Sequence, residues 1–306
     1  MILVDPPLWP AHGTQFSHLV SDTSLAELHA FAELIGLSAR AYDRDHYDLP
    51  ASRYDAAVAA GAREVSPTDV VRALRRAGLR RSKPQAMAAA RAREQRLRDQ
   101  WAAMLPRAVD LGEELLARWS EPFRRYHTPQ HLAEMLAALA AVTDDLRTGA
   151  DPERTLRLAA WFHDAVYQGR AGEDEEASAR LAEESLDGLV SAREVEETAR
   201  LVRLTAAHQV DPDDLPGAIL VDTDLSILGA DDARYVEYTR QVRAEYHQVP
   251  ADAFRRGRLA VLAHLGGLEP LYRTRPGQRW WTGPARTNMA EEGERLRAQQ
   301  RREDQD

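Results

Sequence analysis

The stretch that most constrains the fold is Leu158-Ala-Ala-Trp-Phe-His-Asp-Ala-Val-Tyr167, in which a histidine and an aspartate stand side by side within an apolar run. Apolar residues recur at helical spacing around His163, which predicts a buried helix with His163 on its apolar side; they are Leu156, Ala159, Ala160 and Val166. Asp164 follows at a rotation of about 100°. The imidazole and the carboxylate can therefore converge on one cation, provided that other segments supply further ligands.

Two other segments offer such ligands. Upstream, Thr128 and Pro129 form a helix-start signal, so His127 is expected just outside a helix and His131 in its first turn. Downstream, Asp222 and Asp224 lie in an apolar segment that has every reason to be buried. Because a buried carboxylate is costly unless it is paired or bound to a metal, these aspartates are candidate ligands.

In this order the residues resemble the HD superfamily of metal-dependent phosphohydrolases, and one bacterial branch of it with predicted members of unknown substrate. The resemblance covers roughly residues 87–297, about two thirds of the chain. It depends on five blocks: Tyr126-His-Thr-Pro-Gln-His131, Trp161-Phe-His-Asp-Ala-Val-Tyr167, Glu173-Asp-Glu-Glu-Ala-Ser178, Leu204-Thr-Ala-Ala-His208 and Asp222-Thr-Asp-Leu-Ser-Ile-Leu-Gly229. Several spaced blocks in one order are more specific than a lone His-Asp pair.

The resemblance implies a divalent metal ion bound by His131, His163, Asp164 and Asp224. Nitrogen and oxygen ligands of this kind suit Mn, Fe, Zn, Ni or Co, and Mg less well. The alternative ligand to His131 is His127, and the alternative to Asp224 is Asp222. Residues two apart on a helix face different directions, so only one of the two aspartates is expected to reach the metal.

The resemblance also implies catalytic roles for His127, Asp164 and Glu175. His127 is expected to donate a proton to the leaving oxygen, and an imidazole that titrates near neutral pH suits that role. Glu175 is expected to orient water, although its acidic run could equally be a favoured first helical turn. Five further residues are candidates for contact with substrate: Arg124, Arg125, His208, Asp222 and Arg286.

Composition narrows the remaining possibilities. The net charge of -9 gives no strong nucleic-acid signal, and no cysteine is present, which excludes disulfides and thiolate metal sites. Of 40 lysines and arginines only Lys83 is a lysine, so the 39 arginines reflect a general bias and do not by themselves indicate phosphate recognition. The first twenty residues lack the basic segment that begins a signal peptide. No apolar run reaches the roughly 18 residues that a membrane-spanning helix needs. We expect no membrane span and a cytoplasmic protein.

The fold expected is α+β and multidomain. Residues 1–84 are predicted to form a small α/β domain, with strands at 1–4 and 38–42 and helices at 25–35 and 67–78. The helix bounds follow from N-cap signals at Ser24 and Ser66 and from stop signals at Gly36 and Gly78. This part resembles an uncharacterised bacterial domain of unknown function, through Leu3-Val-Asp5, His18, Ser21-Asp22, Glu27-Leu-His29 and His46-Tyr-Asp48. A long polar loop is expected over 6–22, and Asp5, His18, Asp22 and His46 could line a polar pocket, with a metal there less favoured than solvated turns.

The basic break at 79–84 leads into an all-α HD-type domain at 85–301, followed by a polar tail at 302–306. Helices are predicted at 85–105, 107–119, 129–146, 152–167, 172–186, 192–208, 215–228, 231–246, 251–265 and 282–301. The helix at 85–105 fits a linker and the first helix of the domain equally well.

The function expected from the sequence is metal-dependent hydrolysis of a phosphomonoester or phosphodiester, on a nucleotide or another small phosphorylated metabolite. Two alternatives stay open. One is a nucleotide-sensing module that binds without turnover, and the other is a di-iron oxygenase on the same scaffold, which would need His208 at a second metal. The oligomeric state is left open by the sequence.

Overall fold

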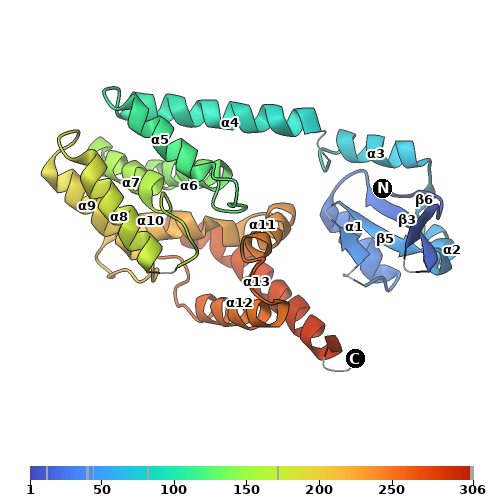
Figure 1. Ribbon diagram of the computed structural model, residues 1–306. Helices are drawn as coiled ribbons and strands as arrows, with labels where there is room; N and C mark the ends of the chain where they lie inside the picture. The colour runs from blue at the N-terminus through green and yellow to red at the C-terminus, as the bar shows by residue number, and fades with distance from the viewer. Residues whose placement is uncertain (12, 39–40, 44, 81–82, 171, 304–306) are drawn as a thin grey trace. The chain divides into compact units, whose positions relative to one another are not determined.

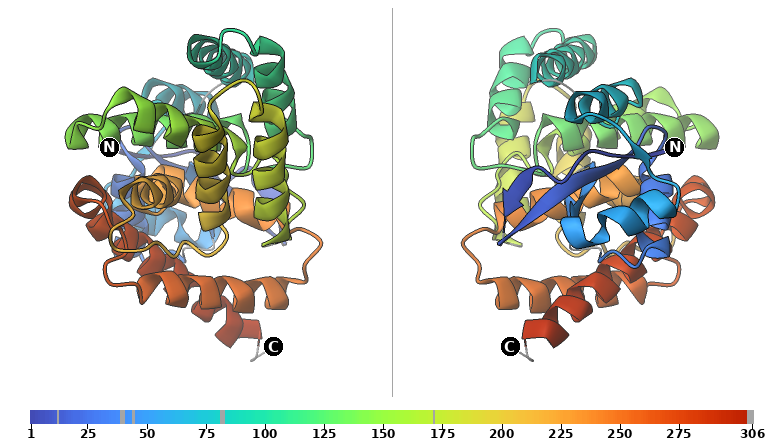
Figure 2. Two further views of the ribbon diagram at one scale, coloured as in Figure 1. Left: turned by 90° about the vertical axis from the view of Figure 1, so that its left-hand side faces the viewer. Right: turned by 90° about the vertical axis from the view of Figure 1, so that its right-hand side faces the viewer.

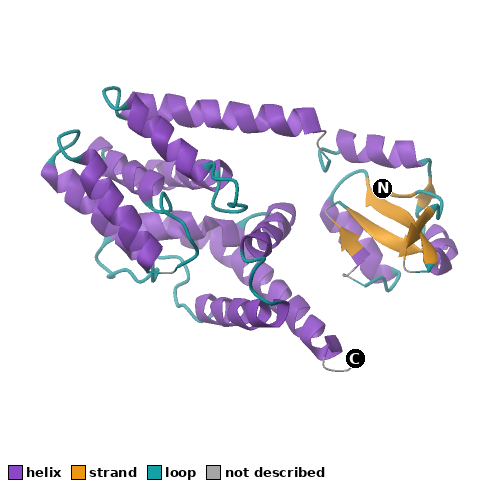
Figure 3. Cartoon of the chain, viewed as in Figure 1, coloured by secondary structure: helices purple, strands orange, loops and turns teal. Residues whose placement is uncertain are grey.

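A computed structural model of the chain describes residues 1–11, 13–38, 41–43, 45–80, 83–170 and 172–303 (Figure 1). The chain divides into two compact units, Met1–Ala89 and Ala90–Asp306, and the division falls within helix α4 (Lys83–Met104). Among the described residues, strands occur only in the first unit (Figure 3). The fold is therefore a small α/β unit followed by a largely helical one, as the sequence predicts.

The first unit is built on one mixed sheet. Its strands run in the order β4-β5-β3-β1-β6, with β2 paired to β3; only β1 and β6 are parallel. The strands are β1 (Ile2–Val4), β2 (Trp9–Ala11), β3 (Thr14–Ser21), β4 (Tyr42–Asp43), β5 (His46–Pro50) and β6 (Arg63–Glu64). Strand β3 lies between β1 and β5 and is buried on both faces along its second half.

Helices cover both faces of this sheet. One face buries Val4, Leu19 and Leu49 against α1 (Leu25–Leu34) and α2 (Tyr54–Ala59). The other buries Leu3 and Val20 against α3 (Pro67–Arg76). Because side chains alternate along a strand, His18 lies on the same face as Val20, toward α3.

The helix signals of the first unit are confirmed, and the loop expected over 6–22 is wrong. The hydroxyl groups of Ser24 and Ser66 accept hydrogen bonds from the backbone at the starts of α1 and α3. Residues 9–11 and 14–21 form the antiparallel pair of β2 and β3. Both faces of the second half of β3 are covered, yet the strand carries the polar residues Ser17, His18 and Ser21, so its sequence looks like a loop. Of the strand expected at 38–42, residues 39–40 lie outside the described part, and β4 begins at Tyr42.

The second unit is a packed set of helices (Figures 1 and 2). Helix α7 is its centre, since it contacts α6, α8, α9 and α10, and residues 158–162 are buried. The elements after α4 are α5 (Val109–Trp119), α6 (Pro129–Leu146), α7 (Ala150–Phe162), α8 (Glu173–Leu186), α9 (Ala192–Leu204), α10 (Leu215–Asp224), the 3-10 helix η3 (Leu225–Gly229), α11 (Asp232–Glu245), α12 (Ala251–Gly266) and α13 (Arg275–Glu303). Each predicted helix is found, and residues 304–306 of the expected polar tail lie outside the described part.

The end of α7 differs from the prediction. The helix stops at Phe162, whereas apolar periodicity extends it to residue 167. The freed carbonyls of Asp164 and Ala165 accept hydrogen bonds from the buried guanidinium of Arg124, at 2.7 and 3.2 Å. The hydroxyl of Ser178 accepts a hydrogen bond from the backbone N–H of Val166 and donates one to its carbonyl. These contacts come from other helices, and they give His163 and Asp164 a position at a helix end.

No helix of the described residues combines the length and the apolar character that a membrane crossing requires.

Candidate metal centre

The sequence brings two imidazoles together from separate helices. Thr128 caps α6 and Pro129 opens it, so His131 stands in the first turn, while His163 is the residue at which α7 ends. Both rings are buried, and their Nε2 atoms lie 3.2 Å apart. The predicted meeting of the first two segments is thus present in the structure.

The other ring nitrogen of each histidine has a partner that fixes the ring. His163 Nδ1 lies 2.8 Å from the carbonyl of Ala160, which can only accept, so Nδ1 carries a proton. His131 Nδ1 lies 3.1 Å from the hydroxyl of Tyr126. A histidine that donates through Nδ1 presents a lone pair at Nε2, and this is how metal-bound histidines are commonly oriented. Tyr126 was part of the resemblance, but no role was predicted for it.

Two carboxylates complete the cluster. Asp164 Oδ2 lies 3.1 Å from His163 Nε2, and Asp224 Oδ1 lies 3.2 Å from His131 Nε2 and 3.6 Å from His163 Nε2. Burial alone would raise the pKa of both carboxyl groups, but the neighbouring histidines lower the pKa of each. Both groups are therefore charged at neutral pH.

The spacing and the charge of these atoms fit a divalent cation. Atoms bound at about 2.1 Å to one ion lie about 3.0 Å apart in an octahedron and about 3.4 Å apart in a tetrahedron. The four distances above fall between 3.1 and 3.6 Å. The ligand atoms of His131, His163 and Asp164 all lie within 4.8 Å of one another, and Asp224 adjoins this group through the two histidines. Two carboxylates beside two imidazole nitrogens favour a positive charge among them, carried by a cation or a proton. In the chain without an ion, burial lowers the pKa of His163 and the carboxylates raise it, with a net value of about 9, so a proton fulfils this need.

Asp222 takes a different role from Asp224. Its buried carboxylate accepts hydrogen bonds from the backbone of Arg273 at 2.8 Å and Thr274 at 2.7 Å, just before α13. Burial raises the pKa of this carboxyl group, and those two amides oppose the rise. Asp224 faces the histidines and Asp222 lies away from them, so the structure separates the two aspartates as helical spacing predicts.

His127 lies beside this cluster and is held by a residue that the sequence did not suggest. Its Nδ1 is 2.7 Å from Glu245 Oε2, and its Nε2 is 3.8 Å from Asp164 Oδ2. Burial lowers the pKa of His127, and Asp164 and Glu245 raise it, with a net rise. His127 thus stands next to the candidate ligands without joining the pair formed by His131 and His163.

Glu245, at the end of α11, also holds the loop that carries His127. Its Oε1 accepts the backbone N–H groups of residues 125, 126 and 127 at 2.7, 2.8 and 3.0 Å. Burial raises the pKa of Glu245, but His127 and the backbone donors lower it to about 2. A lone glutamate among many on a solvated helix gives no signal in sequence, and it lies more than a hundred residues from its partner.

A cavity of about 620 Å³ adjoins the cluster. Its lining combines polar groups with aromatic and aliphatic side chains, and includes Tyr126, His127, His208, Asp224, Leu228, Tyr238 and Arg258. His208 Nε2 lies 3.1 Å from Asp224 Oδ2, so the predicted substrate or second-metal residue does belong to this site. Arg258 pairs with the buried Glu292 at 2.8 and 3.0 Å and is the arginine of this lining.

Four predicted residues serve the scaffold. The Glu175 carboxylate accepts the backbone N–H of Gly172 at 2.5 Å and so caps α8. Arg124 is buried and bonded to Glu121 and to carbonyls at the end of α7, which leaves it unavailable to a substrate phosphate. Arg125 is exposed and donates to the carbonyl of Pro122. Arg286 is exposed and pairs with Glu269 at 2.6 Å.

In the comparison with known proteins, a match was found for the first unit. A family model described as a protein of unknown function (DUF4031) matches residues 2–77. This confirms the resemblance of the first unit to an uncharacterised domain, and the match assigns no activity. No curated protein matches the chain, and no solved structure matches it.

Proposed function

We propose that the helical unit is a metal-dependent phosphohydrolase of the HD type, acting on a nucleotide or another small phosphorylated metabolite. The observation that supports this proposal most strongly is the convergence of His131, His163, Asp164 and Asp224, with neighbouring distances of 3.1 to 3.6 Å. The order of these residues in the chain and the helical architecture are consistent with an HD-type fold. We infer that these four side chains hold the ion.

When bound, a divalent ion at such a site supplies a water of lowered pKa and an electrophile for a phosphoryl oxygen. The protein supplies the other parts of the chemistry. His127 is held by Glu245 at 2.7 Å, which keeps the imidazole oriented and favours its protonated form. A protonated imidazole beside the reaction centre suits proton donation to a leaving oxygen, and such groups contribute about 100-fold to 10,000-fold.

The cavity supports a small substrate. Its volume of about 620 Å³ lies within the range of ligand pockets. His127 and His208 offer polar groups to a phosphate, and Leu225, Leu228 and Val261 form an apolar part of the lining. Arg258 is already bonded to Glu292 and Tyr238. His208 contacts Asp224 and His127 lies beside Asp164, so a phosphate there would be close to the metal ligands, with the remainder of the substrate over the apolar lining.

The test uses purified full-length protein stripped of metal by a chelator. We expect hydrolysis of nucleotide and sugar phosphates to disappear on stripping and to return with Mn²⁺. The variants His163→Ala and Asp224→Ala should stay inactive with added Mn²⁺, whereas His247→Ala, at an exposed histidine after α11, should retain the wild-type rate. Wild-type turnover by His163→Ala would refute the proposal.

One observation favours a second candidate. Asp224 has one oxygen toward His131 and the other toward His208, a geometry in which a carboxylate can bridge two ions. A di-iron oxygenase would therefore require His208 as a ligand. Loss of iron and of oxygen consumption in His208→Ala would support it, whereas unchanged metal content in that variant would exclude it. Nucleotide binding without any product would instead indicate a sensing module.

A further inference from the structure

A second group of potential ligands lies in the first unit, on the face of the sheet that packs toward α3. His18 in β3 and Asp48 in β5 are directly opposite in the antiparallel register, and His46 precedes Asp48 by two residues on the same strand. Alternation along a strand therefore puts all three side chains on one face. One ligand atom from each of them lies within 4.8 Å of the other two.

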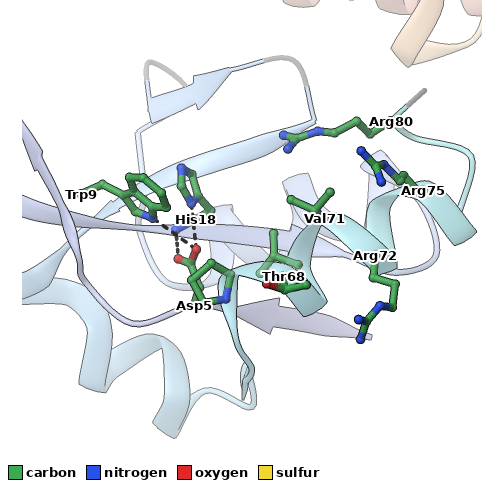
Figure 4. Close-up of a pocket in the computed structure, with 10 residues that line it drawn as sticks. Asp5, Trp9, His18, Thr68, Val71, Arg72, Arg75 and Arg80 are labelled. Atoms are coloured by element: carbon green, nitrogen blue, oxygen red, sulfur yellow. Dashed lines mark hydrogen bonds and ion pairs between the residues drawn. The ribbon is translucent and has the colours of Figure 1, made fainter. Parts of the chain in front are cut away.

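Both histidines are oriented by a buried carboxylate. His18 Nδ1 lies 2.9 Å from Asp5 Oδ2, and His46 Nδ1 lies 3.0 Å from Asp45 Oδ1. Asp5 is fully buried and also accepts from the backbone of His18 and the indole of Trp9 (Figure 4). A carboxylate that holds Nδ1–H leaves Nε2 as a lone pair, and such carboxylate–histidine pairs are typical of metal ligands.

The free nitrogen of His46 points to the third group. His46 Nε2 lies 3.4 Å from Asp48 Oδ1, and the rings of His18 and His46 meet edge to face with centroids 4.8 Å apart. Arg80 Nη2 also approaches His46 Nδ1, at 3.5 Å, but the 3.0 Å contact with Asp45 is shorter and charge-assisted. The ring orientation is therefore set by Asp45, with Nε2 on the side of Asp48.

The balance of charge favours a cation at this point. Three carboxylates, those of Asp5, Asp45 and Asp48, surround the two imidazoles, and Arg80 compensates Asp45 through bonds of 2.6 and 2.5 Å. His18 also lines a cavity of about 600 Å³ together with Arg72, Arg75 and Arg80, of which Arg72 is paired with Asp69. Figure 4 shows these residues. With Arg75 and Arg80 counted against the three carboxylates, the net charge is still negative. The two histidines are partly exposed, so an ion could enter.

We propose that His18, His46 and Asp48 bind a divalent transition-metal ion in the first unit, with Asp5 and Asp45 orienting the two histidines. Two imidazoles and one carboxylate suit Zn, Co, Mn, Fe or Ni. Three protein ligands leave a coordination position open, which is the arrangement of catalytic sites. All of its residues belong to the first unit, so the proposal does not rest on the candidate centre of the helical unit.

The test uses the full-length chain with His163→Ala and Asp224→Ala, so that a bound ion reports on the first unit. Titration with Co²⁺, followed by its visible absorption, should saturate at one ion per chain. Adding His46→Gln or Asp48→Asn should weaken Co²⁺ binding by at least about 10-fold to 100-fold, the loss found even for groups that only support a ligand. The control is Asp55→Asn, an exposed aspartate of α2, which covers the other face of the sheet, and it should leave the affinity unchanged.

Asp48 is half-exposed, so its substitution can be made without disturbing the core, and far-UV circular dichroism checks that each variant is folded. In the otherwise natural chain, His46→Gln should leave the metal-dependent hydrolysis by the helical unit unchanged. The proposal is overturned if the His163→Ala, Asp224→Ala chain binds no Co²⁺, or if folded His46→Gln and Asp48→Asn chains bind it with the parental affinity.

Discussion

Replacing Glu245 by glutamine should weaken both the fold around His127 and the proposed catalysis. The carboxylate accepts three backbone N–H groups at 2.7 to 3.0 Å and meets His127 Nδ1 at 2.7 Å. Glutamine keeps the shape and one carbonyl oxygen. It removes the charge, however, and puts an NH₂ group where His127 Nδ1 now finds an acceptor.

Two routes give the size of the effect on stability. A hydrogen bond to a charged group contributes about 1.5–3 kcal/mol and one to a neutral group about 0.5–1.5 kcal/mol, so three backbone bonds together lose about 3 kcal/mol. The lowering of the Glu245 pKa from 4.5 to about 2 also corresponds to about 3 kcal/mol in favour of the charged carboxylate. The side chain is only 3% exposed, so solvent screens little of this.

Urea denaturation at neutral pH measures the first effect, with Glu237→Gln as the control because Glu237 is exposed on the same helix. We expect a loss of about 3 kcal/mol for Glu245→Gln and less than about 0.5 kcal/mol for the control. In the phosphohydrolase assay kcat should fall by about 100-fold or more, with the metal content unchanged. A Glu245→Gln protein with the stability and kcat of the parent would refute the role assigned to Glu245.

Three further outcomes are expected. Asp222→Ala should lower the unfolding free energy by about 2 kcal/mol, because the backbone N–H groups before α13 lose their acceptor. The metal content of the helical unit should stay unchanged. Loss of the ion would instead show that Asp222 is a ligand. Glu175→Gln should keep kcat within about two-fold of the parent value, because the carboxylate caps α8. A fall in kcat of about 100-fold, the size expected for a proton-transfer group, would instead support a catalytic role for Glu175. Burial raises the pKa of Glu194, but Ser191 and Arg154 lower it below 4.5 overall. Its contribution is therefore present above pH 4.5 and is lost as the pH falls through the lowered value, so the difference in melting temperature between the parent and Glu194→Gln should shrink as the pH is lowered from 4.5. A difference that stays constant down to the acid unfolding of the parent would contradict this.

Local signals in the sequence predicted the helical unit well. Thr128 and Pro129 set the start of α6 at the residue observed, and with it the position of His131. The two-residue spacing of Asp222 and Asp224 indicated that one of them would face away from the histidines. Short-range rules suffice here because caps and helical periodicity act within one or two turns.

Long-range contacts account for what the sequence did not predict. The end of α7 at Phe162 depends on Arg124 and Ser178, which come from other elements. Glu245 becomes part of the site only because α11 packs beside the loop at 125–127. In the first unit, helices cover both sides of the sheet, yet strand β3 carries buried Ser17 and Ser21 and partly buried His18, so its composition resembled a loop.

The most direct test of the account is an anomalous difference map from crystals of the full chain soaked in Mn²⁺. We expect a peak about 2.0–2.3 Å from His131 Nε2, His163 Nε2 and a carboxylate oxygen of both Asp164 and Asp224. A map with no peak among these four side chains, or with the ion bound by Asp222 in place of Asp224, would contradict it.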